Sequence, residues 1–164
     1  MSAFSKIDVK DKDLLASLQG FLKRLLESDK IDALMVPWHL PMISNVMSTL
    51  IMDPETIDNA DPLAPCFPIN AAKMASKLTK KRSGQAVGLV MRPCEIRAFV
   101  ELIKLKQGTL DDIVIISLDC LGAFGNTDYN SFAKEDPMGS TRKFYEHVLE
   151  KKSEAIEGVD LASA

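Results

Sequence analysis

The chain has 164 residues, of which 46% are hydrophobic and 26% are charged, and its formal net charge is -3 at pH 7. A chain of this length and composition can bury one sizeable core, so we expect a single domain over residues 1–164. The acidic balance and the lack of a basic stripe argue against a nucleic-acid partner. No apolar run approaches the length of a membrane span and no signal-peptide stretch is recognisable, so we expect a cytoplasmic protein.

The first half of the chain predicts alternating helices and strands. Leucines recur at helical spacing after Asp11 or Asp13, either of which can cap a helix. Short apolar runs then indicate two strands, and prolines are expected to interrupt regular structure around Trp38 and His39. The predicted elements are a helix ending near residue 28, strands at 31–38 and 46–52, a loop at 54–68 and a helix at 70–81.

The second half contains a strand, helix, strand unit. Apolar runs at 86–91 and 113–118, bounded by Gly or Pro, predict two buried strands. Between them, Ile96, Phe99, Val100 and Ile103 have the spacing of one buried helix face. A crossover of this length returns the second strand parallel to the first. The sequence therefore predicts an α/β fold with a mostly parallel sheet flanked by helices, followed by a long loop, a final helix at 137–155, and a linker or disordered tail at 150–164.

Two cysteines follow these two strands. Cys94 and Cys120 both come just past a predicted carboxyl end, the edge at which open α/β sheets bind ligands. Pro93 suits the first helical position, which places Cys94 in the first turn, where the helix dipole favours a thiolate, and Arg92 and Arg97 add positive charge. This pattern predicts a redox or metal site. The alternative is that both cysteines are small buried hydrophobes.

These residues also carry a resemblance. VMRPCEIRAFVEL followed by IVIISLDCLG resembles the coenzyme F-420 hydrogenase/dehydrogenase beta subunit family, and the preceding DPLAPCFPINAAK is most similar to the branch associated with formate dehydrogenases. Members of this family are iron-sulfur flavoproteins that bind FAD and a 4Fe-4S cluster. They pass electrons between a catalytic dehydrogenase or hydrogenase subunit and a soluble hydride carrier, the deazaflavin coenzyme F-420 or a substitute for it.

The resemblance implies that two residues of this chain are cluster ligands, but two further ligands of the family have no counterpart in it. Cys94 and Cys120 match two of the family's cluster ligands, whereas the other two have no counterpart and the chain has no CxxC motif. A cubane cluster normally takes four thiolates. We therefore expect an N-terminal fragment of a longer subunit, the alternative being a chain that has lost the cluster and binds no cofactor. No family role falls on Cys66.

The sequence contains no motif that defines the residues expected to contact the flavin. No GxGxxG or Walker motif is present, so a flavin site follows from the resemblance alone. Asn70 and the amide groups at the start of its helix are the expected anion contacts, together with Arg92 and Arg97.

The predicted function is that of an electron-transfer subunit of a formate dehydrogenase or hydrogenase complex. The cofactors would carry the chemistry while the protein orients and tunes them. Two alternatives stay open: a non-catalytic α/β assembly or regulatory module, and a thiol-based redox protein that uses Cys94. No Ser/His/Asp set or HExxH motif suggests a hydrolase, and His39 and His147 are given no role.

Overall fold

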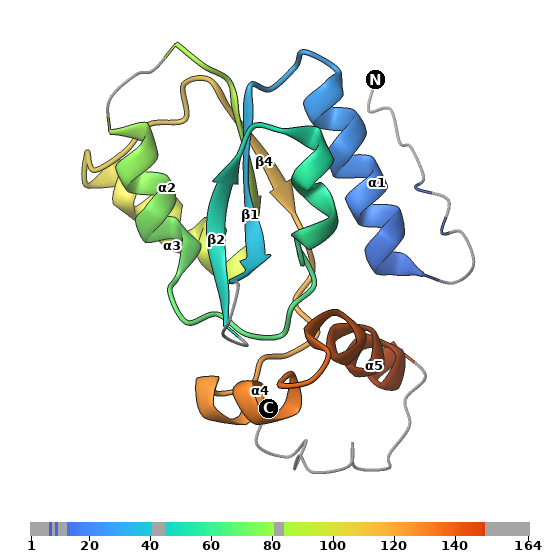
Figure 1. Ribbon diagram of the computed structural model, residues 1–164. Coiled ribbons are helices and arrows are strands. Elements are labelled where there is room, and N and C mark those ends of the chain that lie inside the picture. The colour runs from blue at the N-terminus through green and yellow to red at the C-terminus, as the bar shows by residue number, and fades with distance from the viewer. Residues whose placement is uncertain (1–6, 8, 10–12, 41–44, 81–83, 150–164) are drawn as a thin grey trace.

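A four-stranded sheet forms the centre of the computed structural model, in which residues 7, 9, 13–40, 45–80 and 84–149 are described (Figure 1). The strand order is β2-β1-β3-β4. The strands are β1 (Ala33–His39), β2 (Val46–Ile51), β3 (Val87–Met91) and β4 (Ile113–Ser117). The helices are α1 (Leu14–Glu27), the 3-10 helix η2 (Pro54–Asn59), α2 (Ala71–Thr79), α3 (Pro93–Lys104), α4 (Asn126–Phe132) and α5 (Pro137–Leu149).

The pairing confirms the predicted α/β class with a mostly parallel sheet. Strands β1, β3 and β4 are mutually parallel, and β2 pairs antiparallel to β1 at the edge of the sheet. Helix α3 provides the crossover from β3 to β4, as the spacing of its apolar residues predicts. One residue of that predicted buried face, Val100, is instead exposed.

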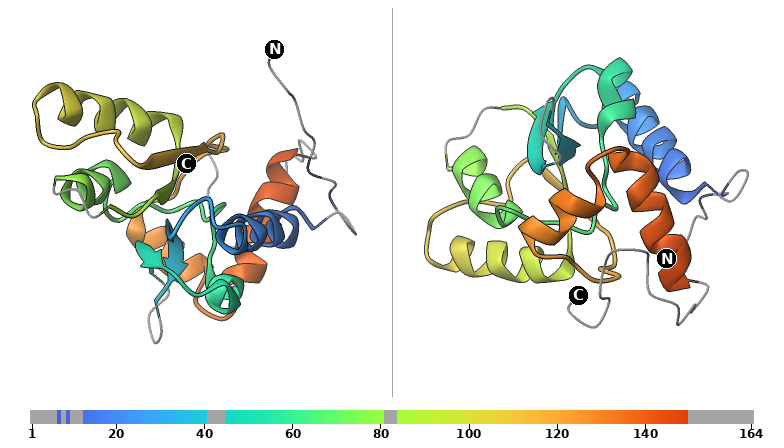
Figure 2. Two further views of the ribbon diagram at one scale, coloured as in Figure 1. Left: turned by 90° about the horizontal axis from the view of Figure 1, so that it is seen from above. Right: turned by 60° about the horizontal axis from the view of Figure 1, so that its bottom comes forward.

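Helices cover both faces of the sheet. Helix α1 and η2 lie on one face, and α2 and α3 lie on the other (Figures 1 and 2). Successive residues of β1 point to opposite faces, so Leu34 and Val36 pack in the cluster beneath α1, whereas Met35 packs in the cluster beneath α2 and α3. On the α1 face of β3 there is no room for a side chain at position 88, because a Cβ at Gly88 would come within 2.8 Å of the side chain of Leu34. The glycine therefore permits close approach of the strand to its neighbours.

Two local expectations need correction. Pro37 was expected to break regular structure, yet it lies within β1. It is tolerated there because β1 pairs with β3 only through Ala33 to Met35, so no amide is required at Pro37 on that side. The loop expected after Cys120 contains α4, which is held in place by burial of Tyr129.

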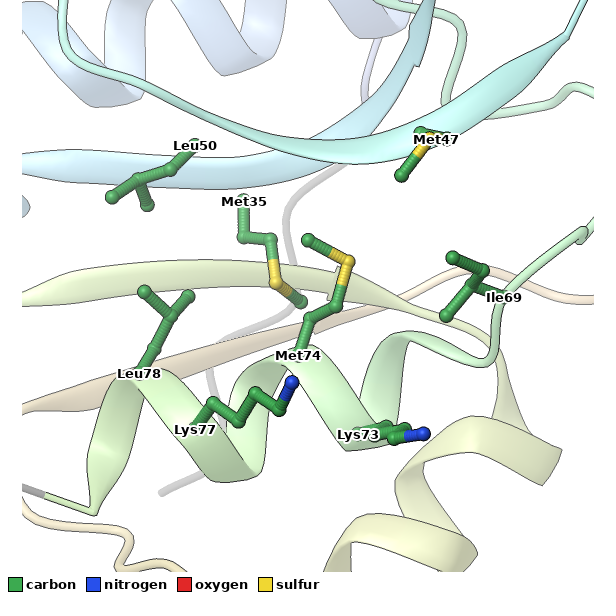
Figure 3. Close-up of a pocket in the computed structure, with 8 residues that line it drawn as sticks. All are labelled: Met35, Met47, Leu50, Ile69, Lys73, Met74, Lys77 and Leu78. Atoms are coloured by element: carbon green, nitrogen blue, oxygen red, sulfur yellow. The ribbon is translucent and has the colours of Figure 1, made fainter.

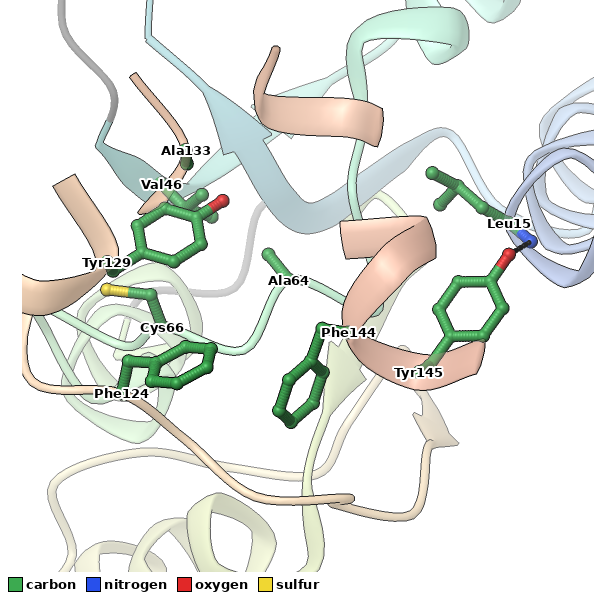
Figure 4. Close-up of a cluster of buried hydrophobic side chains, with 9 residues drawn as sticks. All are labelled: Leu15, Val46, Ala64, Cys66, Phe124, Tyr129, Ala133, Phe144 and Tyr145. Carbon is green, nitrogen blue, oxygen red and sulfur yellow. Dashed lines mark hydrogen bonds between the residues drawn. The ribbon is translucent and has the colours of Figure 1, made fainter. Parts of the chain in front are cut away.

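Helices α4 and α5 form a third group of elements at the carboxyl ends of the parallel strands (Figure 1). Their aromatic residues pack with the start of α1 and with the segment between η2 and α2 (Figure 4). Phe124 contacts Phe144 with ring centroids 5.2 Å apart, and the hydroxyl group of Tyr145 accepts a hydrogen bond from the backbone amide of Leu15. This packing closes off part of the sheet edge at which the two cysteines lie.

Four predicted features lie outside the described residues. They are Asp11 as a cap, residue 81 of the helix predicted at 70–81, the end of the helix predicted at 137–155, and the tail at 150–164. Within the described residues α2 ends at Thr79, with Lys80 as its C-cap. The other cap candidate, Asp13, does cap α1, because its side chain accepts a hydrogen bond from the amide of Ala16.

Candidate functional site

The two cysteines singled out by the sequence lie beyond the ends of two neighbouring strands, at equal distances along the chain. Met91 at the end of β3 is paired with Ser117 at the end of β4. Cys94 is three residues beyond Met91, and Cys120 is three residues beyond Ser117. Both thiols are free and exposed. The parallel register therefore brings two accessible thiols to the same edge of the sheet.

Arg92 provides a buried positive charge beside this edge. Its side chain is only 6% exposed, and its guanidinium group donates a hydrogen bond to the carbonyl oxygen of Ala64 and stacks on Phe67, 3.3 Å from the ring centroid. Burial lowers the pKa of Arg92, whereas the negative charges of Glu95, Cys120, Asp61 and Cys94 act in the opposite direction. Both thiols therefore lie within electrostatic range of one guanidinium group.

Glu95 holds the supporting helices together. One of its carboxylate oxygens accepts a hydrogen bond from the amide of Arg92 at 3.0 Å, and the other accepts from the amide of Ala71 at 2.9 Å. The same carboxylate lies 3.8 Å from the guanidinium group of Arg92. One buried anion thus satisfies donors at the starts of both α2 and α3 while balancing the charge of Arg92.

The amide groups at the start of α2 are already hydrogen-bonded within the protein, which leaves few donors for an anion. The side chain of Asn70 accepts a hydrogen bond from the amide of Ala72 at 2.9 Å, and the backbone oxygen of Asn70 accepts one from Lys73. With Ala71 bonded to Glu95, the amide groups expected to bind a cofactor phosphate already have partners. Asn70 is therefore an N-cap in this structure.

The surroundings of the two thiols differ. Cys94 lies in the first turn of α3 directly after Pro93, as the sequence predicts, and Arg97 is exposed further along the same helix. Cys120 lies in the segment after β4, and its sulfur is 3.6 Å from the carbonyl oxygen of Gly122. Gly122 has a φ of 126°, which favours glycine at this turn.

Cys66 belongs to the core and not to the accessible pair. It is 1% exposed, packs among the aromatic residues of α4 and α5, and lies 3.5 Å from the side-chain oxygen of Asn126. Burial raises the pKa of Cys66 to about 11, although the charge of Arg92 acts in the opposite direction. A buried thiol of this kind is a poor ligand and a poor nucleophile, which agrees with the absence of a predicted role.

A second buried charged group was not anticipated from the sequence. Asp61 is fully buried and accepts hydrogen bonds from the ring of His39 at 2.8 Å, from the hydroxyl group of Thr141 at 2.6 Å and from the amide of Leu63 at 3.2 Å. These contacts join the end of β1 to α5. Asp61 lies in a loop whose sequence has no periodic pattern, so its burial could not be predicted. The one signal for this group was the position of His39 at the end of a predicted strand.

The described side chains do not complete a metal site. Among them, no group of three or more His, Cys, Asp or Glu residues is placed to hold a metal ion. Within the same residues, no helix combines the length and apolar character needed to cross a bilayer. No known family model matches the sequence.

Proposed function

We propose that this chain is an electron-transfer subunit of a formate dehydrogenase or hydrogenase complex, which passes electrons between an iron-sulfur and FAD centre and a soluble hydride carrier such as coenzyme F-420. The observation that carries the proposal is the equal offset of Cys94 and Cys120 beyond a paired strand end. Thiols at such a position are accessible both to a metal cluster and to a partner subunit.

The described residues supply only part of a cluster site. A cubane cluster takes four thiolates, and this edge provides two. The remaining ligands would have to come from a longer chain or from a partner subunit. When bound, a cluster and a flavin exchange single electrons and hydride respectively. The contribution of this chain would be to supply two thiol ligands next to the buried guanidinium group of Arg92.

Reconstitution of the cluster tests this proposal directly. The protein is incubated anaerobically with ferrous iron, sulfide and dithiothreitol, whose thiols can fill the missing ligand positions, and bound iron, sulfide and flavin are then measured. We expect bound iron and sulfide with a broad visible absorption. Cys94→Ala and Cys120→Ala should each lose most of the iron, to similar extents, because both thiols are ligands.

Cys66→Ala is the matched control, because its thiol is buried in the core. It should retain the iron bound by the unmodified protein. Equal iron content in all three variants, or no stable iron in the unmodified protein, would rule out the cluster proposal.

A second candidate is a dithiol redox protein. It is favoured by the presence of two accessible thiols in register without a third ligand among the described residues. Oxidation would form a bond between the two sulfur atoms, with two protons and two electrons passing to an external disulfide such as oxidised glutathione, which becomes two thiols.

Mass spectrometry separates the two candidates. A dithiol protein treated with oxidised glutathione loses two hydrogen atoms and yields a peptide that links Cys94 to Cys120. Each single alanine variant would instead retain a mixed disulfide with glutathione. If the unmodified protein forms only mixed disulfides, the intramolecular pair does not form and the dithiol candidate fails.

A further inference from the structure

An apolar pocket opens on the face of the sheet covered by α2, away from the two thiols. Its volume is about 370 Å³, and residues from β1, β2 and α2 line it. Figure 3 shows Met35, Met47 and Leu50 on the strand side facing Met74 on the helix side. Arg92, Cys94, Glu95 and Cys120 do not line it, so its chemistry is independent of the candidate thiol site. Pockets of this size commonly bind small molecules.

The lining of the pocket combines apolar walls with positive charge. Besides its apolar residues it contains Lys73 and Lys77, which are one helical turn apart on α2 and exposed. Neither lysine forms an ion pair within the described part of the chain, and none of the described lining residues is acidic. Lysine stems can lie along apolar surface while the ammonium groups reach solvent. The pocket therefore has an apolar interior and a cationic rim.

The apolar side chains that line the pocket indicate which class of ligand fits it. The described lining is formed by methionine, leucine and isoleucine, with no aromatic ring on which a planar ligand could stack. Three of these residues are methionines, whose unbranched, polarizable side chains adapt to flexible ligands. Leu50, Leu78 and Ile69 are also exposed beside the pocket, which leaves apolar surface for a ligand to cover. An aliphatic chain fits this surface better than a flat ring.

We propose that this pocket binds a small amphipathic anion, an aliphatic chain that ends in a carboxylate. The chain would lie between β1, β2 and α2, and the carboxylate would be held by Lys73 and Lys77. This proposal does not depend on the proposed electron-transfer function, because no thiol or cluster takes part in the binding.

Methionine-methyl NMR provides a site-resolved test. The sequence contains eight methionines, of which Met35, Met47 and Met74 line the pocket and Met138 lies on α5. Assigned by single Met→Leu substitutions, their methyl signals are followed during titration with sodium decanoate below its micelle concentration. We expect saturable shifts of the three pocket signals without movement of Met138. Decyltrimethylammonium, which has the same chain with a cationic head group, should bind at least about fivefold more weakly.

Substitution of the lysines tests the polar half of the proposal. The double variant Lys73→Gln with Lys77→Gln should weaken decanoate binding about five- to tenfold while retaining side-chain length. Lys30→Gln with Lys80→Gln is the matched control, because it removes the same charge from exposed lysines outside the pocket, and it should change binding less than about twofold.

Three results would overturn the proposal. The first is the absence of any saturable shift, and the second is a shift of Met138 equal to that of the pocket methionines, which indicates unspecific binding. The third is equal affinity for the anionic and cationic chains, which indicates an apolar surface without a preference for anions. Unchanged dispersion of the remaining methyl signals in each variant confirms that the fold is retained.

Discussion

Two buried charged centres lie at the same edge of the sheet, and they are neutralised differently. Arg92 is 6% exposed and is balanced by the carboxylate of Glu95. Asp61 is fully buried but is surrounded by donors that can be neutral, the imidazole of His39, a hydroxyl group and an amide. Arginine keeps its charge in a protein, whereas an imidazole, a hydroxyl group and an amide can each donate a hydrogen bond without carrying a charge.

The buried polar residues at this edge have a structural role, whereas the potentially reactive thiols are exposed. Glu95 joins α2 to α3, and Asp61 joins β1 to α5, so four elements are fixed by two side chains. Cys94 and Cys120 lie at the same edge and are exposed. Buried polar groups thus hold the elements in place while the thiols remain available to partners or ligands.

The largest expected effect is that of Glu95→Ala. It would leave a buried guanidinium group without its counter-ion and two helix-start amides without an acceptor, at a cost of about 3–5 kcal/mol in the free energy of unfolding. Urea unfolding measures this change. Glu101→Ala removes an exposed carboxylate paired with Lys104 on the same helix and should change stability by less than about 1 kcal/mol. Similar values for the two variants would show that Glu95 does not balance Arg92.

Asp61→Ala should destabilise the protein less, by about 2–3 kcal/mol. The three donors lose their acceptor, but His39 and Thr141 can remain uncharged, so no isolated charge is left behind. Asp58→Ala is the control, because Asp58 is exposed on the neighbouring η2, and it should be nearly neutral. If Asp61→Ala lowered the free energy of unfolding more than Glu95→Ala does, the expectation that loss of a counter-ion is the larger effect would be wrong.

Cys66 gives a smaller, pH-dependent effect. Its pKa is raised from 9.0 to about 11 by burial, so between these values the unfolded chain loses a proton that the folded chain keeps. The stabilising contribution is full below pH 9, decreases as pH rises, and is lost above about pH 11. We expect a loss of about 2 kcal/mol across this pH range, because the unfolded chain ionises at Cys66 while the folded chain does not.

The contribution of Cys66 is isolated by comparison with variants that lack the thiol. The free energy of unfolding is measured between pH 8 and 11 for the unmodified protein, Cys66→Ala and Cys66→Ser. Both variants should show a shallower decline than the unmodified protein. Parallel curves would mean that the thiol ionises similarly in the folded and unfolded chains.

The sequence predicted the arrangement of the sheet better than the support beneath the site. Strand ends marked by Gly and Pro were enough to place Cys94 and Cys120 at the same edge, because parallel strands share their carboxyl ends. The contact between Asp61 and Thr141 spans 80 positions along the chain and depends on loop paths that have no periodicity. The helical spacing of Tyr129 and Phe132 was a signal for α4, hidden within a segment rich in Gly and Asn.

The smallest expected effect concerns two buried tyrosines near these centres. The hydroxyl group of Tyr145 accepts a hydrogen bond of 3.4 Å from the amide of Leu15, so Tyr145→Phe should cost about 1 kcal/mol. The hydroxyl group of Tyr129 lies near Thr141 and Asp61 without a well-formed hydrogen bond among the described residues. Tyr129→Phe should therefore be neutral or stabilise the protein by up to about 1 kcal/mol, because it removes a buried polar group that lacks a partner. Thermal and urea unfolding of both variants give the comparison. A clear loss of stability in Tyr129→Phe would mean that this hydroxyl group belongs to the hydrogen-bond network of Asp61, and the Asp61 centre would then extend into α4.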